Sequence, residues 1–237
     1  IEELRRQLGM EFRMAEDYFE AMQSLRPMVA LSQAVRNLSQ DLGRIANDLR
    51  LMGSGPKTGL AEISLPAVQP GSSIMPGKVN PVIPEMMNMV CFSVMGNDLS
   101  VALAAQAGQF ELNVMMPVIQ YKLLDSLSIL SNASKIFHEK CLKGLSVNEK
   151  KCQEYALRSL GIVTVLNPII GYAKASEVVK ESMRTGKLPR EIILEQEILS
   201  AEEVNEVLSP LSMTEPGFRV RENNLTYRIS NTLHNPP

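Results

Sequence analysis

A heptad pattern of large apolar residues runs unbroken through residues 27–52 and leaves this chain few folds other than a bundle of helices. Steps of three and four residues alternate along it, at Met28, Leu31, Val35, Leu38, Leu42, Ile45, Leu49 and Met52. This spacing lines the side chains up along one stripe of an α-helix that packs against other helices. Pro27 suits the first turn of such a helix, and the Gly-Ser-Gly-Pro sequence at 53–56 ends it.

Two more long helices are expected. Residues 86–107 are apolar on every side, so a helix there must be buried on every side, and one chain of 237 residues can hardly surround it. We therefore expect an oligomer core. This helix should start near Asn80 or Pro81, with Asn80 as its N-cap. A third helix is expected over 117–143, ended by Gly144, with an apolar seam at Leu123, Leu127, Leu130, Phe137 and Cys141.

The sequence changes character after Gly144. Shorter helical segments follow, and Ser146–Glu149 and Ser200–Glu203 have the spacing of capping boxes. We place a domain boundary near 145 and expect an all-α protein, with a short strand at 63–66. Residues 1–145 then form a domain of long helices, 146–217 a small helical C-terminal domain, and 218–237 a polar, weakly ordered tail.

The overall charge excludes some partners. The chain has 24 basic and 26 acidic residues, a net charge of −2, and no basic block, so no nucleic-acid partner is expected. No unbroken apolar run reaches the ~18 residues of a membrane span, and no signal peptide opens the chain. Three cysteines in no disulfide or zinc pattern indicate reduced core thiols. We expect a cytoplasmic protein with no membrane partner, no metal site and no cofactor.

Residues 71–85 read GSSIMPGKVNPVIPE and stand out between two helical segments. Glycines allow unusual backbone angles, and backbone N–H groups and serine hydroxyls can surround an anion. Lys78 adds a positive charge and Asn80 a neutral donor, so a small carboxylate would fit. A phosphate-binding loop is not indicated, because GxxxxGK[ST] and a preceding strand are both missing. The alternative is an ordinary connecting loop that caps helices.

The stretch GSSIMPGKVN, with Glu85 downstream, resembles the signature GSSxMPxKxN of the fumarase/aspartase superfamily at every fixed position. The resemblance extends over roughly residues 15–217, through NDLRLMGSGPKTGLAEISLP, GNDLS, GQFELNVMMPVI, KCLKGL, GIVTVLNPIIGY and MTEPG. Within the superfamily, PVIPE and GIVTVLNP are more similar to aspartate ammonia-lyases than to fumarases.

The resemblance implies a reaction and a role for each signature residue. Members remove ammonia or water from a succinate-like substrate to give fumarate, through an aci-carboxylate intermediate. Ser72 matches the family's catalytic base and Ser73 its neighbour in the anion-stabilising set. Lys78 and Asn80 match residues that bind the substrate carboxylate. Glu85 matches a glutamate that orients a histidine from another segment.

The resemblance also implies a partner and alternatives. The family is tetrameric and builds each site from three sequence regions on three subunits, so a homotetramer with a large central helical bundle is expected. Only the third region is present, and neither His138 nor His234 has the context of the active-site histidine. We therefore expect part of a longer enzyme, inactive alone, acting on aspartate or fumarate. Fumarase, with water as leaving group, and a non-catalytic helical module of the same fold remain the alternatives.

Overall fold

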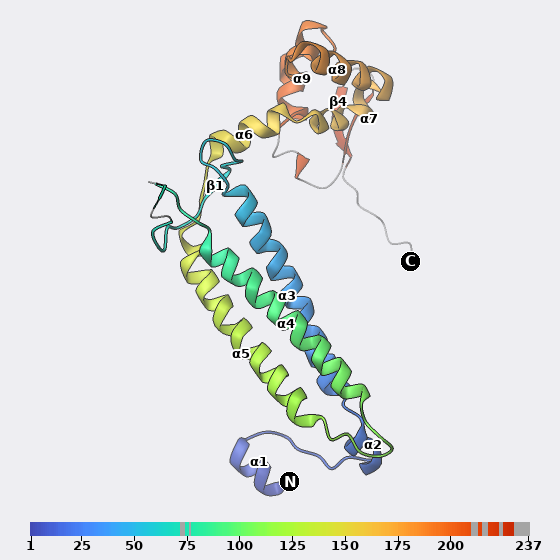
Figure 1. Ribbon diagram of the computed structural model, residues 1–237. Helices are drawn as coiled ribbons and strands as arrows, with labels where there is room; N and C mark the ends of the chain where they lie inside the picture. Colours follow the sequence, from blue (N-terminus) through green and yellow to red (C-terminus); the bar gives the residue numbers. More distant parts are fainter. Residues whose placement is uncertain (72–73, 76, 210–212, 215–217, 223–224, 230–237) are drawn as a thin grey trace. The chain divides into compact units, whose positions relative to one another are not determined.

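Three long helices, antiparallel in sequence order, make up most of the first of two units in the computed structural model (Figure 1). The structure describes residues 1–71, 74–75, 77–209, 213–214, 218–222 and 225–229. The units are Ile1–Val147 and Asn148–Pro237. The elements of the first are α1 (Glu2–Leu8), α2 (Tyr18–Gln23), α3 (Arg26–Met52), β1 (Ile63–Ser64), α4 (Val82–Gln106), α5 (Met116–Lys140), the 3-10 turn η1 (Leu142–Gly144) and β2 (Ser146–Val147).

The expected heptad helix is confirmed as α3, but its large apolar stripe is not its most buried face. The residues it buries inside the unit are mostly small: Ser32, Val35, Ser39, Gly43, Ala46 and Leu49. Along the heptad stripe, Met28, Leu31, Leu38 and Ile45 stay 45–52% exposed. Small side chains let α4 approach α3 closely. The heptad stripe is therefore divided, with Val35 and Leu49 in the chain's own core and these four large side chains exposed on the surface of this unit.

A polar layer crosses the middle of the three helices. Ser32 Oγ on α3 donates to Asp98 Oδ1 on α4 at 2.7 Å, and the Arg36 guanidinium lies 3.2 Å from Asp98 Oδ2. On the other side of α4, Asn97 Nδ2 donates to Asp125 Oδ2 of α5 at 2.9 Å. Buried polar groups are costly unless paired, so these pairs fix the register of α4 against both neighbours.

Helix α4 begins at Val82, close to the expected start, but Asn80 is not its N-cap. The N-cap residue is Pro81 and no side chain caps the helix. Among the described residues, α4 is the one helix long and apolar enough to pass for a membrane span. Its polar side chains Asn88, Asn97 and Asp98 are buried. The third long helix is confirmed as α5, with Leu123, Leu130, Phe137 and its C-cap residue Cys141 buried, whereas Leu127 of the expected seam is 38% exposed.

A small antiparallel ladder closes one end of the three-helix unit. The expected strand at 63–66 is present as β1, and Ile63 pairs with Val147 of β2. Gly144 permits this closure, because a Cβ there would lie 2.7 Å from Cγ of Pro66. The ladder therefore ties the segment after α3 to the chain after α5.

The second unit is a cluster of short helices. Its elements are α6 (Glu149–Arg158), the 3-10 helix η2 (Leu160–Leu166), α7 (Asn167–Ile170), α8 (Tyr172–Thr185), α9 (Pro189–Glu195), α10 (Ala201–Val207), β3 (Phe218–Glu222) and β4 (Leu225–Ile229). Its core contains Leu166, Val178, Ile192, Ile193 and Val204, all at most 1% exposed.

Two local expectations for this region need correction. The capping box at Ser200 and Glu203 is present in α10, whereas α6 is capped by Asn148 and Ser146 lies in β2. Asn148 precedes the first helical turn directly, so its side chain reaches the backbone N–H of Lys151. The polar tail expected over 218–237 instead contains an antiparallel hairpin, β3–β4. Its strands are rich in Val, Thr, Tyr, Phe and Ile, which favour extended backbone over a disordered tail; residues 230–237 lie outside the described part.

The polar layer predicts a measurable stability effect. Replacing Asp98 by Ala leaves the Arg36 guanidinium without its carboxylate, and we expect the free energy of unfolding to fall by about 2–4 kcal/mol. Asp41→Ala, at an exposed position of α3, serves as control and should change it by less than about 0.5 kcal/mol. Denaturant unfolding followed by circular dichroism measures both, and equal stabilities of the two variants would contradict the role given to Asp98.

Candidate active site

The signature segment leads directly into α4, at the end of the bundle that the β1–β2 ladder closes (Figure 1). Ser72 and Ser73, the expected base and its neighbour, lie outside the described residues, so their roles stay predictions. The described candidates are Lys78, Asn80 and Glu85. All three lie within eight positions of one another at the N-terminal end of α4.

The two ends of the segment contact each other through Asn80. Its side-chain Nδ2 donates to the backbone carbonyl of Gly71 at 3.1 Å. Gly71 lies so close to the other end of the segment that a Cβ there would overlap the carbonyl oxygen of Lys78. Between these contacts, Lys78 N donates to Met75 O at 3.3 Å in a turn, and Gly77 has the left-handed φ of 79°. The side-chain amide of Asn80, which was expected to cap α4, therefore joins the two ends of the segment instead.

The surroundings of Lys78 favour an anion. Lys78 is exposed and stands four residues before the start of α4. The N-terminal end of a 25-residue helix carries a partial positive charge, which adds to the charge of the ammonium group. Glu85 is half-buried in the first turn, and its backbone N–H donates to Pro81 O at 3.1 Å. A carboxylate ligand would meet donors held by a rigid element.

A second set of contacts, which the sequence analysis did not single out, anchors α4 to α3 just below the segment. Asn88 Nδ2 donates to the backbone carbonyl of Gly43 at 2.9 Å, inside the core. Arg50 Nη1 donates to Asn88 Oδ1 at 3.0 Å. The sequence feature that could have indicated this contact is Asn88 itself, an asparagine within an otherwise apolar helical segment. This pairing holds the helix that presents Lys78 and Asn80.

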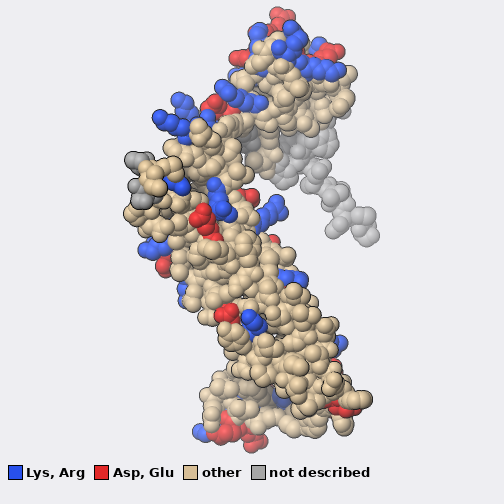
Figure 2. Space-filling model, in the orientation of Figure 1, with Lys and Arg blue, Asp and Glu red and all other residues tan. Residues whose placement is uncertain are grey.

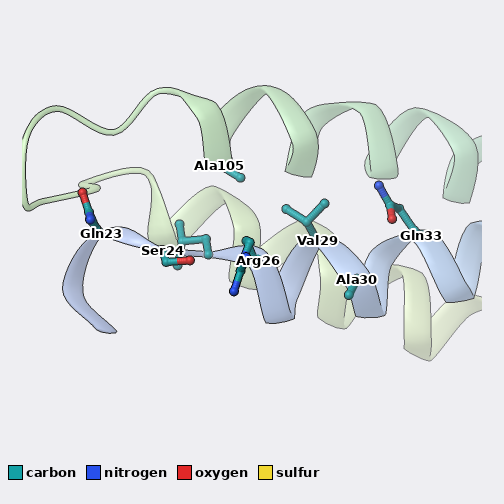
Figure 3. Close-up of a pocket in the computed structure, with 8 residues that line it drawn as sticks. Gln23, Ser24, Arg26, Val29, Ala30, Gln33 and Ala105 are labelled. Atoms are coloured by element: carbon teal, nitrogen blue, oxygen red, sulfur yellow. The ribbon is translucent and has the colours of Figure 1, made fainter. Parts of the chain in front are cut away.

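Other parts of the first unit contain fewer groups that could bind a ligand or catalyse a reaction. A hollow of about 500 Å³ lies between α2, α3 and α4 (Figure 3), lined by Gln23, Ser24, Leu25, Arg26, Val29, Ala30, Gln33 and Ala105. Its lining has one charged side chain, Arg26, which lies 3.5 Å from Glu20. His138 is exposed on α5, while His234 lies outside the described residues. No group of three or more His, Cys, Asp or Glu side chains in the described part could hold a metal ion.

The cysteines are not candidates for a nucleophile. Cys91 and Cys141 are at most 1% exposed, and burial raises the pKa of both thiols. A raised pKa means less reactive thiolate at neutral pH. None of the three cysteines is in a disulfide. Cys91 and Cys141 are core residues as expected, whereas Cys152 is only partly buried.

Comparison with known proteins decides the family. A model described as "Lyase" matches residues 1–96 and one described as "Fumarase C C-terminus" matches residues 162–215, together well over half of the chain. An aspartate ammonia-lyase from Bacillus sp is 48% identical over 221 residues, 93% of this chain and 47% of the relative. The chain belongs to the fumarase/aspartase superfamily. It spans about half the length of the curated relatives it matches.

Solved structures of the superfamily share the fold. A fumarate lyase:delta crystallin from Brucella melitensis, bound to cobalt, superimposes with a TM-score of 0.83 at 43% identity over 90% of this chain and 46% of that one. A class II fumarase from Schistosoma mansoni gives a TM-score of 0.80 at 39% identity, with the same coverage. These likenesses confirm the all-α fold class, with long bundle helices and short helices after them.

The cysteine environments predict a labelling order. With iodoacetamide at neutral pH, the half-buried Cys152 should be alkylated first. Cys91 and Cys141 should react at least about tenfold more slowly, because they are buried and their raised pKa lowers the thiolate fraction. Mass spectrometry of timed digests measures the order, with denatured protein as the control in which all three react. Rapid labelling of Cys91 in folded protein would show that the α3–α4 contact opens.

Proposed function

We propose that this chain carries the signature segment of an aspartate ammonia-lyase, which converts L-aspartate to fumarate and ammonia. The complete GSSIMPGKVN match, within 48% identity to an aspartate ammonia-lyase along nearly the whole chain, carries the proposal. The corresponding identity to a class II fumarase is 39%. The donor-rich N-terminal end of α4 supports a dicarboxylate as substrate.

The proposed chemistry begins at the carbon next to one substrate carboxylate. Ser72 takes a proton from this carbon, and the electron pair of the C–H bond passes into the carboxylate to give an aci-carboxylate. The C–N bond then breaks, its electron pair leaves with ammonia, and the double bond of fumarate forms. The hydrogen is a very weak acid, so the doubly negative intermediate must be stabilised by donors already in place.

The described residues supply such donors. Lys78 provides a positive charge, Asn80 a side-chain amide, and α4 the positive end of its dipole. Serine is a weak base, and it acts as one only where positive charge and donors stabilise its alkoxide and water is excluded. Glu85 orients a histidine of another segment in this scheme.

The leaving group is tested directly by fumarate formation. The full-length protein that contains this chain is given aspartate or malate, and the absorbance of fumarate is followed. Turnover of aspartate with little on malate supports the ammonia-lyase. The reverse preference would establish the fumarase, and no turnover of either would favour the non-catalytic module.

In this proposal the protein associates with further copies of itself to form a homotetramer. An exposed seam on α4 supports it: Met89, Phe92, Leu99 and Leu103 are 53–63% exposed and follow heptad spacing. Gly96 lies in the middle of this seam with no atom of its own chain within 4 Å of an added Cβ. Over the three-helix unit, the surface in Figure 2 shows broad areas without charged side chains. An apolar groove of about 430 Å³ also runs between α3 and α5.

Two variants of the full-length protein test the roles of the signature residues. Ser72→Ala should lower kcat by about 10²–10⁴-fold with little change in KM, because the proton has no acceptor. Lys78→Ala should raise KM and lower kcat, each by about tenfold or more, because its charge meets a carboxylate in both substrate and intermediate. Steady-state kinetics measures both. Normal turnover of Ser72→Ala would exclude it as the base.

The assembly is tested at Gly96. Apart from the local helix backbone, no atom of its own chain lies within 4 Å of a Cβ added at Gly96, so Gly96→Leu should keep its helical circular dichroism, whereas close packing of a second copy should be blocked. Light scattering should show a species smaller than a tetramer. Gln40→Leu, an exposed position opposite the α3 stripe, is the control that should leave the assembly intact. Intact tetramers of Gly96→Leu would show that the subunits do not pack against one another through this seam.

A further inference from the structure

The Asn80 side chain makes a hydrogen bond that neither helix capping nor substrate binding requires. Its Nδ2 spans nine positions of sequence to donate to the Gly71 carbonyl at 3.1 Å. The helix start it was expected to cap is left without a side-chain cap. A half-buried amide normally pairs with the nearest orphan backbone groups. Here it pairs with the far end of the signature segment.

Gly71 has a matching constraint from the other side. A Cβ on Gly71 would overlap the carbonyl oxygen of Lys78 and lie 2.8 Å from Cα of Val79. These are backbone atoms, which cannot turn aside as the end of a flexible side chain can. The absence of a side chain at Gly71 therefore allows the two ends to touch, and the hydrogen bond from Asn80 holds them there.

We propose that Asn80 and Gly71 form a clasp that fixes the two ends of the signature segment together, so that Asn80 is a positioning residue in addition to any contact with substrate. This inference rests on the proposed function for its effect on catalysis but not for the clasp itself. An asparagine amide carries two N–H donors. One serves Gly71 and the other remains for a carboxylate, so both roles are compatible in one side chain.

The clasp has a consequence for the Lys78–Val79 peptide bond. A protease must bind several residues on each side of the bond it cuts in an extended form. The Lys78 carbonyl is packed against Gly71 while the clasp is closed, so trypsin reaches this bond only after local opening. Lys57 and Lys122 are the adjacent basic residues along the chain. Cleavage after Lys78 is therefore identified by a fragment that begins at Val79.

Limited proteolysis of the full-length protein tests the clasp without any assay of activity. In Asn80→Asp, which keeps the size but removes the donor, and in Gly71→Ala, cleavage after Lys78 should rise at least about tenfold over wild type, as loss of a hydrogen bond allows. Cleavage after Lys57 is the internal reference and should not change. Ile74→Ala, which alters an exposed side chain in the same segment, is the matched control and should behave as wild type. Unchanged cleavage after Lys78 in both clasp variants would overturn the proposal.

Kinetics separates positioning from binding. Gly71 has no side chain to contact substrate, so if the clasp positions the segment, Gly71→Ala should lower kcat by at least about tenfold with a smaller change in KM. If Asn80 acted through substrate contact alone, Gly71→Ala would keep its kcat and Asn80→Asp would mainly raise KM, which would overturn the positioning role. Should wild type convert neither aspartate nor malate, the proposed function fails, while the proteolysis result still decides the clasp.

Discussion

The close contact between α3 and α4 is the interaction on which the rest of this structure depends. It is made by small residues of α3, with Gly43 and Ala46 facing Met87 and Cys91 of α4, all buried in one core. Because Gly43 has no side chain to cover its backbone, Asn88 reaches its carbonyl inside the core. A Cβ at Gly43 would already be in van der Waals contact with Cβ of Cys91 at 3.5 Å, so there is little room between the helices for a longer side chain. The position of α4 fixes in turn where Lys78 and Asn80 stand.

The same contact decides which surfaces are left over. Because α3 turns mostly small residues toward α4, four of its large heptad residues, Met28, Leu31, Leu38 and Ile45, stay exposed, and α4 likewise presents an exposed apolar seam. An isolated chain would expose this seam to water, at a cost that grows with area. Association with further copies would remove that cost, which is the physical ground for the homotetramer proposed above.

The sequence predicted the long helices well because their signals are local and repeated. The α3 stripe, the Gly53 stop and the Ser200–Glu203 cap each depend on residues a few positions apart. Heptad spacing did not say which helices each part of the α3 stripe meets: Val35 and Leu49 lie in the chain's own core, whereas Leu38 and Ile45 stay exposed. Asn80 was misassigned for a similar reason: an asparagine before a helix suits an N-cap, and its bond to Gly71 depends on how the loop folds back. The β3–β4 hairpin was missed because polar residues outweighed the β-forming ones.

In the proposed function, α4 carries the signature segment at its N-terminal end and the exposed apolar seam farther along. Proton abstraction beside a carboxylate needs donors that do not rearrange as charge develops. Holding a loop in one conformation costs conformational entropy, so a loop needs further contacts to keep its donors in place. The segment is held at two places, by the Asn80–Gly71 hydrogen bond at its base and by the hydrogen bond from Arg50 of α3 to Asn88, nearly two turns into α4. Farther along, Asp98 fixes the same helix in register with α3. A displacement of α4 would therefore move Lys78 and Asn80 together, so that the proposed assembly through the seam and the geometry of the proposed site would be linked through one rigid helix.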